Sequence, residues 1–301
     1  MKISELSASA LALRLGEGEL AYSCGPFVVR VASPVRELRD GLRLLYADYE
    51  LSDGFADFRV DLSPAAGLRR FIRPQVLFTA DGEEPFEPFP RDQAYPLYEW
   101  ALNWCMATTI QDYLIIHAAV IERGGLAMIL PGKPGAGKST LAAALVNRGW
   151  RLLSDELTLI TDTRLIVPLP RPVGLKNDSI GVIRAFAPEA ILSPPTYNTD
   201  KGTVAHMKPD AAHVARAGET ARPGWIVFPH WEEGAPARLT PHAKPDAMLD
   251  LAVNSFNYAL FGERGFELLC DVVEESGCFD FSYGSLDEAA ALFARLEPQS
   301  R

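Results

Sequence analysis

A glycine-rich segment near the middle of the chain has the residue types and spacing of a phosphate-binding loop. Residues 132–139, GKPGAGKS, match the pattern GxxxxGK[ST] at every position. The three glycines let backbone N–H groups curve around phosphate oxygens, and the N-terminus of a following helix adds partial positive charge. The segment therefore predicts a site for the β- and γ-phosphates of a nucleotide.

Two side chains of this loop have distinct predicted roles. Lys138 supplies a mobile ammonium group to the phosphates, and the hydroxyl of Ser139 is a hard oxygen ligand suited to Mg²⁺. ATP and Mg²⁺ are accordingly the predicted cofactors. The residues expected to contact the nucleotide are Gly132, Lys133, Pro134, Gly135, Ala136, Gly137, Lys138, Ser139 and Thr140.

Two adjacent carboxylates follow the loop closely in sequence. The run Arg151–Glu156 indicates a strand that ends at Asp155 and Glu156. Small P-loop kinases often place an acid at this strand end, whereas in many motor ATPases the acid comes much later. One carboxylate can take the proton of an acceptor hydroxyl, and the other can hold Mg²⁺ directly or through water; which does which stays open. The predicted metal ligands are Ser139, Asp155 and Glu156.

The segments around the loop predict the elements that position it. A strand over 114–121, a turn at 122–125 and a second apolar run over 126–130 predict a hairpin that leads into the loop. The two carboxylates are expected at the carboxyl edge of a parallel sheet, beside the loop. A helix over 140–148 is expected to follow the loop and to stop at Gly149.

Further elements follow from hydrophobic spacing. Residues 97–111 predict a core helix whose apolar face holds Leu97, Trp100, Ala101, Trp104 and Thr108. Residues 168–209 contain seven prolines and predict a long irregular stretch. The remaining predictions are a buried strand over 225–228 and helices over 245–261 and 286–296.

Three cations and one histidine are second candidates for the site. Arg171, Lys176 and Lys201 lie in the proline-rich stretch, where a flexible loop could bring a cation to the transferring phosphoryl group. Arg171 is the one predicted to be catalytic. Alternation along the strand places His117 on one face with Ala119, which alone favours a hydrogen-bonded structural histidine.

The order of these motifs resembles a known kinase family. The segment 117–156 resembles HPr kinase/phosphorylase, a bacterial protein-serine kinase whose P-loop fold is shared with phosphoenolpyruvate carboxykinase. Both have a strand histidine, a hairpin, the loop, its helix, Arg-Gly and an acidic pair, although Glu156 stands where that family has a second Asp. Further along, the chain looks like the HprK-related kinase A family, through RPVGLKNDSI (171–180), DKGTVAHMKP (200–209), WIVFP (225–229) and SFNY (255–258).

This resemblance implies an α/β fold with a P-loop kinase core, Asp155 as catalytic base and His117 near it. It implies ATP- and Mg²⁺-dependent transfer of the γ-phosphoryl group to a hydroxyl, first of all a serine of a peptide or small protein. A small-molecule hydroxyl kinase and a regulatory nucleotide-binding or ATPase module are the alternatives. The identity of the acceptor stays open.

Chain length and composition set the remaining expectations. The 301 residues are enough for about two domains, and four prolines within 81–96 favour a boundary there. We expect an N-terminal α+β domain over 1–96 and a catalytic domain over 97–301. The N-terminal domain has no recognisable chemistry, so docking, an interface of a homo-oligomer and support of the kinase sheet are all open roles.

Charge and apolar pattern exclude several classes of partner. The net charge of −10 argues against nucleic acid and against an anionic membrane surface. No apolar stretch approaches the roughly 20 residues needed to span a bilayer, and the first residues do not resemble a signal peptide. Four scattered cysteines predict reduced thiols without a zinc site. We therefore expect a cytoplasmic protein.

Overall fold

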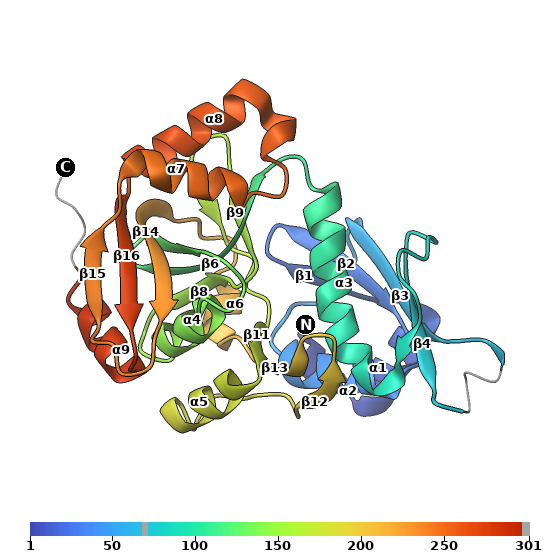
Figure 1. Cartoon of the computed structure of the whole chain (residues 1–301). Helices are drawn as coiled ribbons and strands as arrows, with labels where there is room; N and C mark the ends of the chain where they lie inside the picture. The colour runs from blue at the N-terminus through green and yellow to red at the C-terminus, as the bar shows by residue number, and fades with distance from the viewer. Residues whose placement is uncertain (68–71, 297–301) are drawn as a thin grey trace.

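The computed structural model describes residues 1–67 and 72–296. In this part of the chain a smaller N-terminal region and a larger C-terminal region lie side by side (Figure 1). No helix of the described residues is long and apolar enough to cross a membrane. The four cysteines are free thiols, as predicted.

The N-terminal region is a five-stranded sheet packed against helices. Its strand order is β1-β2-β3-β4-β5, with a parallel β2–β3 pair among antiparallel neighbours. Along β3 buried and more exposed side chains alternate, as expected for a sheet with one covered face. The elements are η1 (Ile3–Glu5), α1 (Ala8–Glu17), β1 (Leu20–Cys24), β2 (Phe27–Ala32), α2 (Arg36–Leu45), β3 (Phe58–Pro64), β4 (Gln75–Ala80), β5 (Phe89–Pro90), η3 (Arg91–Gln93) and α3 (Ala94–Thr109).

Helix α3 exists as predicted, but it buries a different face. Leu97 and Ala101 are in the core of the N-terminal region, together with Leu102 and Met106. Trp100 and Trp104 remain 38% and 40% exposed and Thr108 is exposed too, so the predicted apolar face is wrong at these three positions. The helix begins at residue 94 and packs on the N-terminal core, while the predicted boundary at residue 96 stays a prediction.

The C-terminal region is built around an eight-stranded mixed sheet. The order is β10-β9-β6-β7-β14-β16-β15, and β8 also pairs with β6. Helices α4 and α9 pack on one face of this sheet, and α7 and α8 on the other (Figure 1). The strands are β6 (Leu114–Arg123), β7 (Leu126–Pro131), β8 (Arg151–Ser154), β9 (Leu157–Ile160), β10 (Ile166–Val167), β14 (Arg222–Trp231), β15 (Arg238–Pro241) and β16 (Gly277–Tyr283), and the helices are α4 (Lys138–Val146), α7 (Lys244–Val253), α8 (Tyr258–Glu274) and α9 (Leu286–Ala294).

The predicted hairpin and the loop's helix are present, with shifted ends. Strands β6 and β7 form the antiparallel hairpin, and α4 follows the loop. The helix ends at Val146 rather than at Gly149, because the side-chain amide of Asn147 already caps the carbonyl of Ala143 at 2.8 Å. The single helix predicted over 245–261 is two helices. The break lies at Asn257, whose side chain bonds to the backbone of the 110–115 segment.

The stretch 168–209 is not irregular, contrary to the prediction. It folds into a three-stranded antiparallel sheet, β11 (Val173–Lys176), β13 (Gly202–Met207) and β12 (Thr196–Thr199), with helix α5 (Asp178–Phe186) between β11 and β12. The short helix α6 (Ala211–Ala215) comes next. The prolines lie mainly before β11 and between α5 and β12, outside the hydrogen-bonded ladders. This small sheet lies between the two larger regions (Figure 1). Lys208, directly after β13, forms an ion pair with Asp48 of the N-terminal region at 2.6 Å.

Candidate active site

Strand β6 pairs with both strands that lead into the site: β7, which leads into the loop, and β8, which leads into the acidic pair. Both β7 and β8 run antiparallel to β6, so their carboxyl ends lie at the same edge of the sheet. Pro131 at the end of β7 is opposite Ala118, and Ser154 at the end of β8 is opposite Val120. The sheet is locally antiparallel rather than parallel as predicted, yet the two ends still meet. The glycine-rich loop and the acidic pair are therefore neighbours in space.

The loop has the backbone that its sequence predicts. Gly132, Gly135 and Gly137 all have positive φ angles, of 141°, 88° and 92°, which other residues adopt only with strain. Among the described residues, no protein group accepts a hydrogen bond from the backbone N–H of Gly135 or Gly137. The first N–H groups of α4 are free of helical partners in the same place. The loop thus presents unpaired donors suited to an anion.

Lys138 is buried at the base of this loop and folds back over it. Its Nζ donates to the carbonyls of Gly132, at 2.5 Å, and Lys133, at 3.3 Å. Burial lowers the pKa of the Lys138 ammonium, while the charges of Glu156 and Asp155 oppose that shift. Ser139 and Thr140 lie in the first turn of α4, directly after the loop, and both are half-buried.

Asp155 is the buried carboxylate of the pair. Its Oδ2 accepts the backbone N–H of Gly174 at 2.9 Å, and its Oδ1 is buried with no hydrogen-bond partner among the described residues. Burial, reinforced by the negative charge of Glu156, raises the pKa of Asp155 to about 7, against the opposing effects of Gly174 and the Ser139 hydroxyl. A carboxyl in this environment can exchange a proton near neutral pH.

Glu156 is the more exposed carboxylate, and it pairs with His117. The Nε2 of His117 lies 3.1 Å from Oε2 of Glu156, and His117 is opposite Leu157 across the β6–β9 pair. Burial acts to raise the pKa of Glu156, but the hydrogen bond and charge of His117, with the charges of Lys176 and Lys201, lower it to about 2. The two adjacent acids therefore differ: one holds a proton readily and the other stays ionised.

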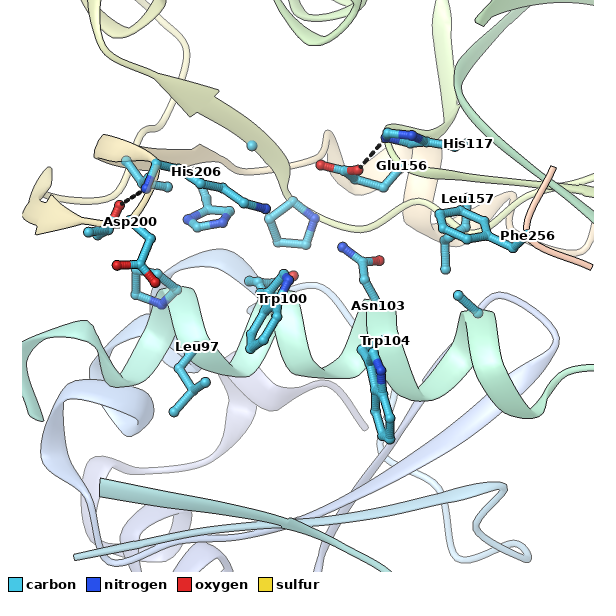
Figure 2. A pocket seen from close by; sticks show the side chains of 18 of the residues that line it. Leu97, Trp100, Asn103, Trp104, His117, Glu156, Leu157, Asp200, His206 and Phe256 are labelled. Atoms are coloured by element: carbon cyan, nitrogen blue, oxygen red, sulfur yellow. Dashed lines mark hydrogen bonds and ion pairs between the residues drawn. The ribbon is translucent and has the colours of Figure 1, made fainter. Parts of the chain in front are cut away.

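A cavity of about 630 Å³ opens on the Glu156 side of the pair. Its lining includes His117 and Glu156 on one side and α3 on the other (Figure 2). Lys176 and Lys201 also line it. Lys201 is partly desolvated there, which together with the charge of Lys176 lowers its pKa. The residues of the glycine-rich loop do not line this cavity. The carboxylate pair thus separates the loop on one side from a cavity on the other.

Arg171 does not face the loop. Its guanidinium is buried, pairs with Oε2 of Glu99 at 2.6 Å and donates to Oδ1 of Asn103 at 2.5 Å. These contacts tie the segment before β11 to helix α3. The catalytic role predicted for Arg171 gains no support from this placement, whereas Lys176 and Lys201 do reach the cavity beside Glu156.

Sequence reasoning missed two groups that shape the site. The N–H of Gly174 is a direct partner of Asp155, and Asn103 reaches the cavity from a helix that was assigned wholly to the core. Nothing in the local sequence marks Gly174, because its partner is far away in the chain. The only mark of the cavity in the sequence is the aromatic content of α3, which carries Trp100 and Trp104 on either side of Asn103.

The site contains oxygen atoms that suit Mg²⁺. Asp155 Oδ1 has no partner although it is buried, and the Ser139 hydroxyl acts on the same carboxyl. Among the described residues, no group of three or more His, Cys, Asp or Glu side chains could hold a metal. Mg²⁺ usually keeps several waters and binds one or two carboxylates together with substrate phosphates. Ser139 and the acidic pair therefore fit Mg²⁺ bound together with a nucleotide.

Comparison with known proteins shows a partial relationship. No family model matches the chain. HPr kinase/phosphorylase of Stenotrophomonas maltophilia is 34% identical over 55 residues, which are 18% of this chain and 17% of that protein. The HPr kinase/phosphorylase of Chloroherpeton thalassium is 39% identical over 49 residues, 16% of this chain and 14% of that protein. The matched segments thus span less than a fifth of the curated relatives.

A solved structure gives a weaker likeness. The HPr(Ser) kinase/phosphatase from Coxiella burnetii aligns with 60% of this chain and 95% of its own, at 12% sequence identity and a TM-score of 0.22. A likeness at this level carries no argument about the fold. The similarity to HPr kinase/phosphorylases thus lies in the sequence of a short part of the chain.

Proposed function

We propose that this protein is a Mg²⁺-dependent kinase that transfers the γ-phosphoryl group of ATP to a hydroxyl, with a serine of a peptide or protein as the acceptor. The observation that carries the proposal is the position of the acidic pair between two different surfaces. Unpaired backbone donors lie on one side, and a cavity large enough for an acceptor lies on the other. A nucleotide-binding module without an acceptor needs only the first of these surfaces.

Each group has a role in this proposal. The loop N–H groups and Lys138 bind the phosphates, and Ser139 with the acidic pair would hold Mg²⁺, which supplies charge neutralisation when bound. Asp155 takes the proton while the hydroxyl oxygen bonds to the γ-phosphorus. The bond from that phosphorus to the β–γ bridging oxygen breaks, and ADP leaves. Glu156 stays ionised and holds His117 at the cavity.

Labelled ATP tests this proposal directly. The full chain is incubated with γ-labelled ATP, Mg²⁺ and fractions of a bacterial lysate, and mass spectrometry identifies what gains a phosphate. Asp155→Asn is expected to reduce transfer by about 10²–10⁴-fold, the usual contribution of a general base, while ATP still binds to the loop. Phosphate release that continues unchanged in Asp155→Asn, with no phosphorylated product, would instead identify a regulatory ATPase.

A further inference from the structure

The α3 side of the cavity has no part in the proposed phosphoryl transfer. Three residues of this helix, Trp100, Asn103 and Trp104, line the cavity opposite His117 and Glu156 (Figure 2). Helix α3 also packs in the N-terminal core, so the surface it presents has a fixed position. A fixed surface that faces the acidic pair is placed to contact whatever brings the hydroxyl.

Asn103 presents a defined hydrogen-bond donor to the cavity. Arg171 has only donors, so the amide atom that contacts its Nη1 must be the oxygen of Asn103. Arg171 is itself held by its ion pair with Glu99 and by a 3.0 Å bond to the Glu99 carbonyl. The Nδ2 group of Asn103 then has no protein acceptor in the described parts of the chain, and the side chain projects from α3 toward the Glu156 side (Figure 2). Arg171 is therefore a positioning residue for this donor.

Large apolar side chains surround the cavity and reach the surface. On the α3 side Trp100 and Trp104 are 38% and 40% exposed, and on the opposite side Phe256 and Leu260 are 49% and 73% exposed. Trp100 and Trp104 also pack against Phe86, with ring centroids 4.4 and 5.1 Å apart, which holds them in place. Exposed apolar residues that gather around one cavity of a soluble protein typically mark an interaction site. A site that only a small molecule fills would enclose its apolar residues more completely. These exposures favour a chain that enters the cavity and continues over its edge.

From these contacts we infer that the cavity binds a peptide segment whose serine or threonine is flanked by bulky apolar residues, with a backbone carbonyl of the segment accepting from Asn103 Nδ2. This inference rests on the proposed kinase function for the choice of a hydroxyl residue. The apolar neighbours contact Trp100, Trp104 and Phe256, while the hydroxyl lies at the carboxylate end. The N-terminal region would thereby select the acceptor that the C-terminal region phosphorylates.

Affinity selection tests this inference without requiring catalysis. The immobilised full chain, with Mg²⁺ and a non-hydrolysable ATP analogue, is exposed to a library of short peptides that have a central serine and randomised neighbours. Two variants probe the cavity. Asn103→Asp keeps an oxygen for Arg171, removes the Nδ2 donor and adds a negative charge. Trp104→Ala removes apolar contact. Phe266→Ala is the control, because Phe266 is 51% exposed but does not line the cavity.

We expect the unmodified chain and Phe266→Ala to retain peptides with aromatic or aliphatic neighbours of serine. Retention should fall on the order of tenfold in each cavity variant, the size of a moderate contact in an interface. Retention of no peptide, absence of an apolar preference, or retention by both cavity variants equal to that of the unmodified chain would overturn the inference. The selected peptides are then supplied with ATP and Mg²⁺. Peptides that bind but gain no phosphate contradict the kinase function alone, whereas phosphorylation of small alcohols without peptide retention contradicts the peptide site alone.

Discussion

The two sides of the acidic pair are built in different ways. On the Asp155 side, the glycine-rich loop is one contiguous segment, 132–139, whose backbone and Lys138 form the surface. On the Glu156 side, the cavity combines α3, the small sheet around Lys176 and Lys201, and the turn before α8. The first surface depends on local backbone geometry, and the second depends on packing between distant parts of the chain. A variant on one side should therefore impair the function of that side, phosphate binding at the loop or acceptor binding in the cavity, and leave the other side intact.

The largest expected effect is a loss of stability at the buried ion pair between Arg171 and Glu99, on the cavity side. Arg171→Met leaves Glu99 buried without a cation, which should lower the free energy of unfolding by about 3–5 kcal/mol. Urea denaturation measures this loss. ATP affinity, measured by fluorescence of a labelled nucleotide, should be unchanged, because Arg171 does not contact the loop.

A double variant provides the control for this prediction. Arg171→Met combined with Glu99→Leu removes both charges and should recover most of the lost stability, since an apolar pair often replaces a buried ion pair at little cost. A stable Arg171→Met chain that no longer binds ATP would show that Arg171 acts on the loop side, as the sequence first predicted.

The corresponding variant on the loop side is Lys138→Met, which should impair phosphoryl transfer and leave the cavity side intact. Loss of the ammonium that neutralises phosphate charge should reduce phosphoryl transfer by about 10²–10³-fold, the usual effect of removing one strong donor at a transition state. Peptide retention by the cavity should remain, because Lys138 does not line it. Single-turnover assays with labelled ATP measure the rate. A decrease in the transfer rate of less than a few fold would mean that the Lys138 ammonium does not contact the transferring phosphoryl group.

This contrast also explains how much the sequence alone could predict. The hairpin, the loop, its helix and the adjacent acids lie within about forty consecutive residues, so spacing was enough to place them. The small sheet was missed because β11 and β13 pair across some thirty residues. The prolines between them interrupt the alternation of apolar and polar residues by which a strand is predicted. Arg171 was assigned to the phosphate because its type suits phosphate, but Glu99 is its partner through tertiary packing. Local chemistry was predictable, whereas partners that come from other regions were not.

The third prediction separates the two acids by their pH dependence. Because burial and the charge of Glu156 raise the pKa of Asp155 to about 7, the folded chain keeps a proton that the unfolded chain releases near pH 4. In metal-free buffer, Asp155 should therefore contribute a fall in stability as pH rises between these values, by at most about 1.4 kcal/mol per pH unit. Burial of His206, which lowers its pKa to about 4, contributes a rise in stability over part of the same range. Glu156 has the opposite pKa shift to Asp155, and its contribution is lost only as pH falls from above its ordinary pKa toward about 2.

Denaturation curves at several pH values measure this dependence. Asp155→Asn should lose the falling contribution between about pH 4 and 7, so its stability should increase more with pH than that of the unmodified chain. Glu156→Gln should only reduce the falling contribution, since burial is the larger cause of the shift. Identical slopes in the unmodified chain and in Asp155→Asn would assign the proton to another group.

The smallest expected effects lie within the loop, where two glycines with similar backbone angles differ in their surroundings. Gly135 has a φ of 88° and open space where a Cβ would lie, so Gly135→Ala should cost only the backbone strain, about 1 kcal/mol. Gly137 has a φ of 92°, and a Cβ there would lie 2.6 Å from the Tyr283 hydroxyl, so Gly137→Ala should cost more. Adding Tyr283→Phe to Gly137→Ala removes the clashing oxygen and should recover part of the difference in urea denaturation. Equal losses for the two alanine variants, or no recovery in the double variant, would mean that backbone strain alone sets the requirement for glycine and that Tyr283 does not press on the loop.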